Sequence, residues 1–409
     1  MSVTDSDVLI IGAGPSGAVA AALLCKRGYR VEVLEKTHFP RFSIGESLLP
    51  QCMDVLDEAG FTARVAEAGF QLKDGAVFVN GAQRATFDFR DKSVPGWDTT
   101  HQVVRADFDH LLAEGAEAAG ARIRFGCEIV SFDFDGARAR LNARMDTGRE
   151  CAFAARFVLD ASGFGRVLPR LLSLEWPSTF PVRRSLFTHV EDRISNAQYD
   201  RQKILIAMHP VHHDVWYWLI PFSDGRSSVG VVATPEFLDG LAGEPEANLR
   251  TLIGQESAMA ELLGAARYDT PVQEITGYSA DVTSLHGPGF ALLGNAGEFL
   301  DPIFSSGVTI ALKSASLAAG VLDLQLRGES VDWERDFATP LKKGIDTFRA
   351  FVEFWYDGRF QDIVFYPDQQ PQVKRMLTSV LAGYAWDVDN PYVARTRRRL
   401  DVLARLCRR

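Results

Sequence analysis

The first forty residues carry the sequence pattern that most constrains what this chain can fold into. Four apolar residues, Val8–Ile11, predict a buried strand, and the turn 12–17, with the sequence Gly-Ala-Gly-Pro-Ser-Gly, follows at once. An alanine- and leucine-rich helix is expected over 18–27, and a second strand over 31–34 ends on Glu35. This order of strand, glycine turn, helix, strand and acid is typical of a dinucleotide-binding unit.

Each glycine of the turn has a distinct expected role. Gly12 permits the tight turn, Gly14 lets backbone N–H groups approach a pyrophosphate, and Gly17 lets helix and strand pack closely. The N–H groups at the start of the helix are unpaired and carry partial positive charge, which favours a phosphate there. Glu35 is placed to accept hydrogen bonds from ribose hydroxyls.

Length and composition limit the classes of protein to which the chain can belong. A chain of 409 residues is longer than one ordinary domain, and 46% hydrophobic with 24% charged residues is typical of a soluble globular protein. The net charge of -9 argues against a nucleic-acid partner. We expect the arginine-rich end, 395–409, to be a solvated helix face.

Cysteine usage and hydropathy predict the compartment. Five cysteines, an odd number without CxxC spacing, favour reduced thiols in a cytoplasmic protein over disulfides or a metal site. No apolar run approaches the ~18 residues that span a membrane, and residues 1–6 are too short and too acidic for a signal peptide. The prediction is a cytoplasmic protein without bound metal and without stable membrane insertion.

The remaining periodicity predicts an α/β chain in which two domains alternate. Apolar and polar residues alternate over 76–89 as in a hairpin, and over 185–232 as in a broad antiparallel sheet. Helices are expected over 51–59, 103–119 and 308–324, and strands over 122–125, 129–134, 137–144, 152–155, 157–160 and 290–293, the first four forming a small meander. We therefore predict a discontinuous Rossmann-type nucleotide-binding domain (1–75, 100–170, 280–330) interlaced with an antiparallel-sheet substrate domain (76–99, 171–279), followed by a helical C-terminal region (331–409).

Polar groups stand in an otherwise apolar loop after the second strand. Arg41, Glu46 and Ser47 lie in a segment rich in Phe, Ile and Leu, which predicts a polar site with apolar walls. The alternative is that Arg41 and Glu46 form a surface pair of little consequence. Arg105 begins a predicted helix, where a cation opposes the helix dipole unless a phosphate or a carboxylate offsets it.

Two later segments also predict binding. The buried strand over 157–160 runs into Asp160-Ala161-Ser162-Gly163, where the glycine gives the backbone freedom to run beside a cofactor. Segment 299–307, Phe-Leu-Asp-Pro-Ile-Phe-Ser-Ser-Gly, places a proline-broken turn before a helix N-terminus. Such an arrangement makes an anion site.

These landmarks, together with the turn at Gly294-Asn295, resemble the flavoprotein monooxygenase superfamily over about residues 5–330. The resemblance implies FAD, bound extended, with its pyrophosphate on the first helix and its ribityl chain near the last turn. The chain departs from the superfamily at Asn295, where most members carry aspartate. An amide still hydrogen-bonds a ribityl hydroxyl, but it removes a negative charge near the flavin.

Within that superfamily, three features resemble the flavin-dependent halogenases, especially their phenol and pyrrole branch. Segment 40–47 is similar to the family's loop beside the flavin, 216–221 fits WxWxIP, and 299–307 fits FxxPxxSxG. The resemblance implies that Ser306 and Gly307 surround a halide, and that Lys73 stands in the place of the catalytic lysine. On the residues alone, the aromatic strand is as readily a packed sheet face, and a lone lysine is usually a solvated surface group.

The motifs and the resemblance together give a set of candidate site residues. The predicted catalytic residues are Lys73, Glu46 and Ser47. The predicted cofactor-binding residues are Gly12, Gly14, Pro15, Ser16, Gly17, Glu35, Lys36, Arg41, Ser47, Arg105, Asp160, Gly163, Asn295, Pro302, Gly307 and Val308. The predicted halide-binding residues are Ser306 and Gly307.

The resemblance also implies a reaction. A separate flavin reductase supplies FADH2, which with oxygen and halide yields hypohalous acid inside the protein. Lys73 then presents this acid to an electron-rich phenolic or pyrrolic ring, free or tethered to an acyl carrier protein.

Two other functions stay open. The layout also resembles oxidoreductases found with aryl-polyene pigment assembly, which implies an FAD-dependent monooxygenase or dehydrogenase, and a third candidate is a catalytically idle flavin-binding assembly partner.

Overall fold

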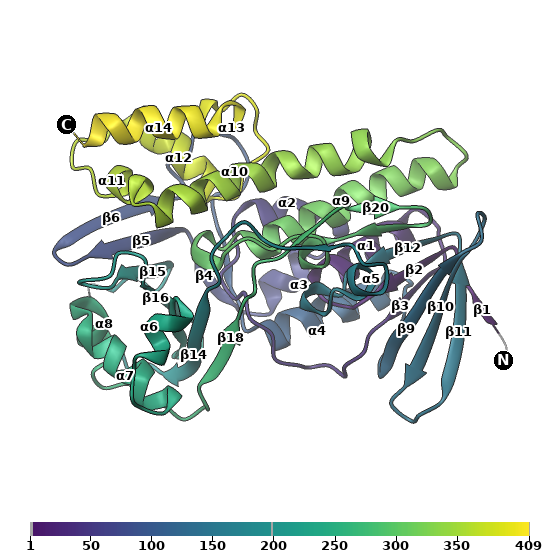
Figure 1. Ribbon diagram of the computed structural model, residues 1–409, viewed down its shortest axis with the longest axis horizontal. Coiled ribbons are helices and arrows are strands. Elements are labelled where there is room, and N and C mark those ends of the chain that lie inside the picture. Colours follow the sequence, from purple (N-terminus) through teal and green to yellow (C-terminus); the bar gives the residue numbers. More distant parts are fainter. Residues whose placement is uncertain (1–2, 198, 409) are drawn as a thin grey trace.

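The computed structural model describes residues 3–197 and 199–408 and has a mixed α/β fold (Figure 1). At its centre is a six-stranded sheet in the order β20-β21-β12-β2-β3-β8, parallel except for the pair β20 and β21. Its strands are β2 (Val8–Ile11), β3 (Val31–Leu34), β8 (Arg122–Arg124), β12 (Phe157–Asp160), β20 (His286–Gly287) and β21 (Phe290–Leu292). The helices α1 (Pro15–Lys26), α4 (Arg105–Ala118) and α9 (Ser306–Leu326) pack together, with α1 against β2 and β3.

The opening unit folds as its pattern predicts. Every residue of β2 and β3 is buried, as expected for a parallel sheet that is covered on both faces. α1 begins at Pro15, earlier than the apolar run indicated, because proline fixes a helical φ and is favoured in a first turn.

A second sheet of seven strands has the order β18-β14-β17-β16-β15-β5-β6. Its strands are β5 (Gly75–Asn80), β6 (Gln83–Asp88), β14 (Arg184–Glu191), β15 (Lys203–Met208), β16 (Trp216–Pro221), β17 (Arg226–Ala233) and β18 (Gln273–Thr276). It is antiparallel apart from one parallel pair, β5 with β15. Trp216 and Trp218 face the main core, whereas Tyr217 and Leu219 face a second core under α6 (Pro235–Asp239), α7 (Pro245–Gln255) and α8 (Ser257–Leu263).

The position of the strand predicted over 122–125 is a correction to the sequence analysis. We expected it in the meander, but β8 pairs in parallel with β3 at the edge of the six-stranded sheet. β8 follows α4, which packs against α1, so the chain returns to the six-stranded sheet through a helix, the usual connection to a parallel strand. The meander is a separate sheet in the order β1-β11-β10-β9, formed by β1 (Val3–Asp5), β9 (Cys127–Phe134), β10 (Ala139–Met145) and β11 (Glu150–Ala155).

The C-terminal region is helical, as predicted. Its α-helices are α10 (Thr339–Tyr356), α11 (Arg359–Val364), α12 (Pro371–Leu381), α13 (Pro391–Ala394) and α14 (Thr396–Cys407). α10 runs beside α9 along the top of the view in Figure 1. α9 is long and apolar enough to span a membrane by length and composition, yet most of its apolar stretch is buried within the fold, where it contacts α1, α2 (Gln51–Ala59) and α10.

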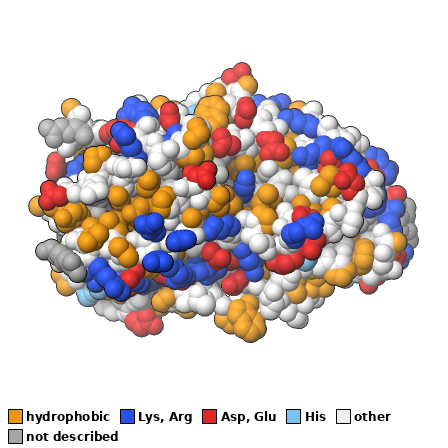
Figure 2. Space-filling model, turned by 90° about the horizontal axis from the view of Figure 1, so that it is seen from above, with side chains coloured by type: hydrophobic (Ala, Val, Ile, Leu, Met, Phe, Trp, Pro, Cys, Tyr) orange, Lys and Arg blue, Asp and Glu red, His pale blue; other side chains and the backbone are white. Residues whose placement is uncertain are grey.

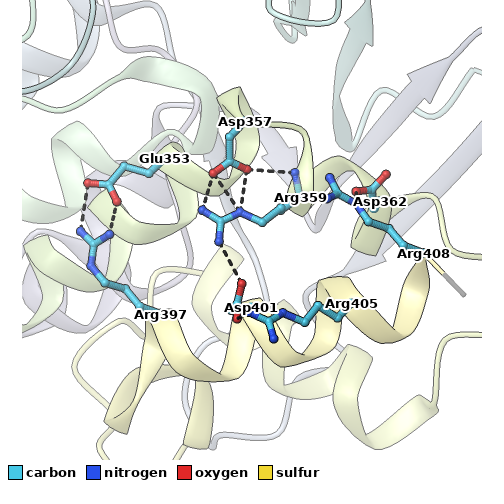
Figure 3. Close-up of polar contacts among 8 residues, drawn as sticks. All are labelled: Glu353, Asp357, Arg359, Asp362, Arg397, Asp401, Arg405 and Arg408. Carbon is cyan, nitrogen blue, oxygen red and sulfur yellow. Dashed lines mark hydrogen bonds and ion pairs between the residues drawn. The ribbon is translucent and has the colours of Figure 1, made fainter.

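Ion pairs hold α14 to α10 and α11 (Figure 3). The pairs are Arg397 with Glu353, Arg408 with Asp362, and Arg359 with both Asp357 and Asp401. Leu400 and Ala404 of α14 face the core, whereas Arg398 and Arg399 are exposed. Seen from above relative to Figure 1, basic and acidic side chains lie intermixed with apolar patches on the surface (Figure 2). Since such exposed pairs each contribute little to stability, burial of Leu400 and Ala404 is the larger contribution to holding α14.

Candidate active site

The glycine turn leaves the N-terminus of α1 open on one side. Gly12 has a φ of +93°, and a Cβ there would lie 2.7 Å from the Ala161 carbonyl oxygen. A Cβ on Gly17 would lie 1.9 Å from the Gly12 carbonyl oxygen, so both positions require glycine. At Gly14 a Cβ would meet only the Arg41 guanidinium, at 3.4 Å. On this side of the turn the nearest neighbour is thus a flexible side chain, not backbone.

The Gly14 side of the turn is electropositive. Pro15 and Ser16 begin α1, and none of the described side chains caps its first N–H groups. Arg41 stands beside Gly14, with its guanidinium 3.2 Å from the Asp109 carboxylate. Helix dipole and guanidinium together favour an anion at this position.

Glu35 and Lys36 follow β3 but point to different surroundings. Glu35 is buried, and its carboxylate accepts hydrogen bonds from the N–H groups of Ala13 (2.8 Å) and Thr37 (2.9 Å). Through the Ala13 N–H, Glu35 thereby holds the glycine turn in place. Lys36 is exposed and donates to Glu128 of β9 (2.7 Å).

Arg105 is offset by a carboxylate within the protein. Its guanidinium donates to both oxygens of Asp109 (2.8 and 3.0 Å) and to the carbonyls of Ile44 (2.6 Å) and Gly45 (3.2 Å). The conflict between a cation and the helix start is resolved without a phosphate. The arginine also fixes the loop that leads to Glu46, while its contact with a cofactor stays a prediction.

Hydrogen bonds within the protein fix Asp160 and the turn that follows it. The Asp160 carboxylate is buried and accepts from the N–H groups of Ser162 (2.9 Å) and Leu168 (2.6 Å). Arg166 donates to the carbonyls of Asp281 (2.7 Å) and Asn295 (3.4 Å), and so connects the turn that contains Gly163 with the turn at Asn295. The structure gives Asp160 a structural role, and its contact with a cofactor stays a prediction.

An apolar cavity lies between the seven-stranded sheet and the loops around Glu46 and Pro302. Its lining residues are Ile44, Gly45, Glu46, Ser47, Phe164, Ser185, Phe187, Ile204, Trp216, Trp218, Ile220, Ile275, Tyr278, Phe299, Pro302, Ile303, Ser305, Gly307 and Val308. The face formed by Trp216, Trp218 and Ile220 is therefore both packed sheet and cavity wall. A cofactor ring and an aromatic substrate are the kinds of group that such a wall accommodates.

The N-terminus of α9 opens onto this cavity. Ser305, with a φ of +56°, precedes the helix, and within the described part of the chain no side chain caps the first turn. Gly307 and Val308 line the cavity, whereas Ser306 is buried and does not line it. Asn295 lies nearby, with its side-chain oxygen 4.0 Å from the position of a Cβ on Gly307. The free N–H groups of this turn can bind an anion at the cavity wall.

Lys73 is buried without a carboxylate partner. It lies in β4 (Gln71–Lys73) and is 1% exposed; its ammonium donates to the Leu48 carbonyl (2.8 Å) and lies 5.4 Å from the centre of the Phe89 ring. No ion pair involves it among the described residues. Burial lowers the pKa of Lys73 to about 7. The solvated-surface alternative is thus excluded. Lys73 does not line the cavity, and its amine bonds to the carbonyl of Leu48, the residue after the lining residue Ser47.

Glu46 and Arg41 do not pair with each other. Glu46 is fully buried, and one of its carboxylate oxygens lies 2.5 Å from Nε2 of His189 on β14. Its other oxygen has no hydrogen-bond partner among the described residues. Since Arg41 contacts Asp109 instead, the predicted alternative of an Arg41–Glu46 surface pair is wrong.

Sequence reasoning missed several residues at this site. They are Asp109, His189, Ser305 and Tyr356. Ser305 lies within the predicted anion segment, and Asp109 stands one helical turn after Arg105, so both had a local signal. His189 and Tyr356 had none, because each reaches the site from an element distant in sequence.

The residues at the glycine turn fit FAD. The uncapped helix, the approach left open at Gly14 and the guanidinium of Arg41 suit a pyrophosphate. The cavity between Trp218 and the α9 N-terminus suits a flat, largely apolar ring. These two features fit the two ends of an extended dinucleotide.

Comparison with known proteins agrees with this fit. A family model described as FAD binding domain matches residues 5–285. The chain is 30% identical over 383 residues to the 1H-pyrrole-2-carbonyl-[peptidyl-carrier protein] chlorinase of Pseudomonas fluorescens, covering 87% of this chain and 84% of that protein. It is 31% identical over 339 residues to the tryptophan 2-halogenase of Chondromyces crocatus, covering 80% of this chain but only 62% of that longer protein. A solved structure of a flavoprotein/dehydrogenase from Cytophaga hutchinsonii superposes with a TM-score of 0.96 at 44% identity, over 99% of both chains.

The chain therefore belongs to the FAD-binding family of flavoproteins that includes the flavin-dependent halogenases. The predicted cofactor, FAD, and the predicted class, an FAD-dependent enzyme of the oxidoreductase type, are confirmed. The predicted resemblance to halogenases is confirmed as well.

Proposed function

We propose that this protein is a flavin-dependent halogenase that uses FADH2, oxygen and halide to halogenate an electron-rich phenolic or pyrrolic ring. The observation that carries the proposal is the Lys73 amine, which is buried without a carboxylate beside the wall of an apolar cavity. An unpaired buried lysine costs stability, and perturbed groups of this kind gather at functional sites. The halogenase relatives give the reaction class.

Each end of the cavity has a separate task in this proposal. Bound reduced FAD supplies activation of oxygen, which oxidises halide to hypohalous acid. Gly307 and the first turn of α9 hold the halide through backbone N–H groups, as in our prediction with Ser306. Trp216 and Trp218 exclude water, which protects a reactive acid from hydrolytic loss.

Lys73 directs the oxidant to the substrate. A lysine with a pKa of about 7 supplies both an ammonium that hydrogen-bonds hypohalous acid and an amine that accepts halogen. Lys73 does not line the cavity and is bonded to the Leu48 carbonyl, so the proposal requires the segment Ser47–Leu48 to move when cofactor or substrate binds. Glu46 and Ser47 form the wall at this point and are proposed to act with the lysine.

The proposal extends to domains, partners and compartment. We place FAD in the discontinuous unit predicted over 1–75, 100–170 and 280–330, and the substrate against the sheet of 76–99 and 171–279. The named substrate of one relative is a pyrrole on a peptidyl carrier protein, which supports a tethered substrate here. A separate flavin reductase and a cytoplasmic location complete the proposal.

A second candidate function is an FAD-dependent dehydrogenase or monooxygenase. Similarity to the flavoprotein/dehydrogenase of Cytophaga hutchinsonii favours it, at 44% identity over 99% of both chains. In that case Lys73 has no task in the chemistry.

One experiment separates the two functions. The protein, loaded with FAD and supplied with a flavin reductase, NADH, oxygen and bromide or chloride, is incubated with phenols, pyrroles and carrier-bound aromatic acids. We expect a product whose mass and isotope pattern show halogen in place of hydrogen. Hydroxylated or desaturated product without halogen, over the whole panel, would establish the second function instead.

A further inference from the structure

Glu46 and His189 form a buried pair that connects the cavity with the protein surface. The Glu46 side chain is fully buried and lines the cavity, whereas 19% of the His189 side chain is exposed. Their facing atoms, a carboxylate oxygen and Nε2, are 2.5 Å apart. The second carboxylate oxygen of Glu46 is buried and has no hydrogen-bond partner among the described residues, although Glu46 itself lines the cavity.

Aromatic rings isolate this pair from its surroundings. The ring of Phe222 lies edge-on to the His189 ring at 5.1 Å, and the ring of Phe42 lies 6.2 Å away. These rings neither accept nor donate protons, so the polar neighbours of the imidazole are solvent, at its exposed part, and the Glu46 carboxylate.

No other described charged side chain that contacts the loop around Glu46 is placed to exchange a proton with it. Arg105 of α4 contacts the loop, but its guanidinium is committed to Asp109 and to two loop carbonyls, and an arginine does not give up its proton. His101 contacts the loop through its backbone carbonyl, and burial lowers the pKa of its imidazole.

The proposed reaction consumes protons inside the cavity. Its overall balance replaces an aromatic C–H bond by a carbon–halogen bond, oxidises FADH2 to FAD and reduces oxygen to two waters. Of the four hydrogens in those waters, two come from FADH2 and one from the aromatic ring, so one proton enters from solvent in each turnover. A positioned titratable side chain is one way to carry this proton past apolar walls.

We infer that His189 and Glu46 form the path by which this proton passes from solvent into the cavity. His189 takes a proton at its exposed side and passes one from Nε2 to Glu46, whose free oxygen delivers it to the cavity. The inference rests on the proposed halogenase function and adds to it a residue outside the motif segments.

Three variants test the path. Glu46→Gln keeps the size of the side chain but removes its capacity to carry a proton, and His189→Ala removes the exposed donor. We expect each to lower the halogenation rate by at least about a hundredfold, the lower end of what proton transfer contributes, with FAD affinity within about twofold of wild type. His286→Asn is the matched control, because His286 also faces a carboxylate, Glu334 at 3.3 Å, but on β20. We expect it to match wild type.

Two further measurements should change only if protons pass through Glu46 and His189. Imidazole added to the buffer should restore the rate of His189→Ala but not that of Glu46→Gln. In the ligand-free protein, the 15N NMR signals of the His189 ring should shift in Glu46→Gln, while those of His286 stay in place. If wild type halogenates and Glu46→Gln does so at a rate within about twofold of wild type, the path is wrong while the proposed function stands. The same holds if His189→Ala loses activity and added imidazole does not restore it. If wild type yields no halogenated product, the proposed function fails and the path fails with it.

Discussion

The Tyr356 hydroxyl donates a hydrogen bond of 2.9 Å to the buried carboxylate of Asp301, which directly precedes Pro302 at the cavity. The same hydroxyl accepts a hydrogen bond of 3.0 Å from the Trp216 indole. The Arg183 guanidinium lies over the Tyr356 ring at 4.1 Å. The last residue of α10 thus joins the anion segment to the aromatic wall, and the C-terminal helices shape the site although they supply no lining residue.

Removal of this hydroxyl should destabilise the protein. In Tyr356→Phe the buried Asp301 carboxylate and the Trp216 indole each lose a partner, which costs about 1–3 kcal/mol in the free energy of unfolding. Urea denaturation measures it. Tyr217→Phe is the control, because the buried Tyr217 hydroxyl has no hydrogen-bond partner among the described residues, and no loss of stability is expected. Equal effects of both substitutions would contradict the bridging role of Tyr356.

Asp301 should also make stability depend on pH in the acid range. Burial raises the pKa of its carboxyl to about 6 from an ordinary value of 3.8. Between these values the folded state binds more protons than the unfolded state, so the free energy of unfolding falls as pH rises from about 4 to 6. Asp301→Asn should remove this contribution, as measured by denaturation at several pH values. An identical pH dependence in wild type and variant would show that Asp301 titrates normally.

Gly230 should be essential to the cavity wall. It stands opposite Trp218 in the pairing of β16 with β17, and a Cβ on Gly230 would lie 2.3 Å from the Trp218 ring. Gly230→Ala should displace this ring, lower stability by about 1–3 kcal/mol and change tryptophan fluorescence. Gly254→Ala is the control: no atom lies within 4 Å of a Cβ there, and alanine in α7 should raise stability by up to ~1 kcal/mol. Unchanged stability and unchanged fluorescence in Gly230→Ala would contradict the close packing of Gly230 against the Trp218 ring.

Lys73 should oppose folding at neutral pH. Its pKa is about 7 in the folded state against 10.5 ordinarily, because burial disfavours the ammonium. Between these values the unfolded state binds more protons, so stability should rise with pH from about 7 to 10 by up to about 1.4 kcal/mol per pH unit. Lys73→Met should lack this contribution, so its stability relative to wild type should be greatest at or below pH 7 and decline above it. A constant difference across this range would mean that the lysine is not desolvated.

The sequence predicted the elements that depend on local pattern. β2, β3, β12 and α2 match their predicted bounds, because apolar runs and glycine stops determine them locally. The edge position of β8 depends on the handedness of a crossover, so the alternation of its residues gave no signal for it. In the site, segment 299–307 was predictable from its proline and the following helix. Neither the Glu46–His189 pair nor the Tyr356–Asp301 bond was, since each joins residues more than fifty positions apart.

The most direct test of the account compares halogenated product from wild type and Lys73→Met under the same supply of FADH2, oxygen and bromide. Mass spectrometry measures the product, flavin absorbance measures bound FAD, and a thermal melt at pH 7 measures folding. We predict that Lys73→Met binds FAD as wild type does, melts at an equal or higher temperature, and yields less than about a hundredth of the product. Undiminished halogenation by this variant, with bound flavin and an intact fold, would contradict the central claim that Lys73 directs the oxidant.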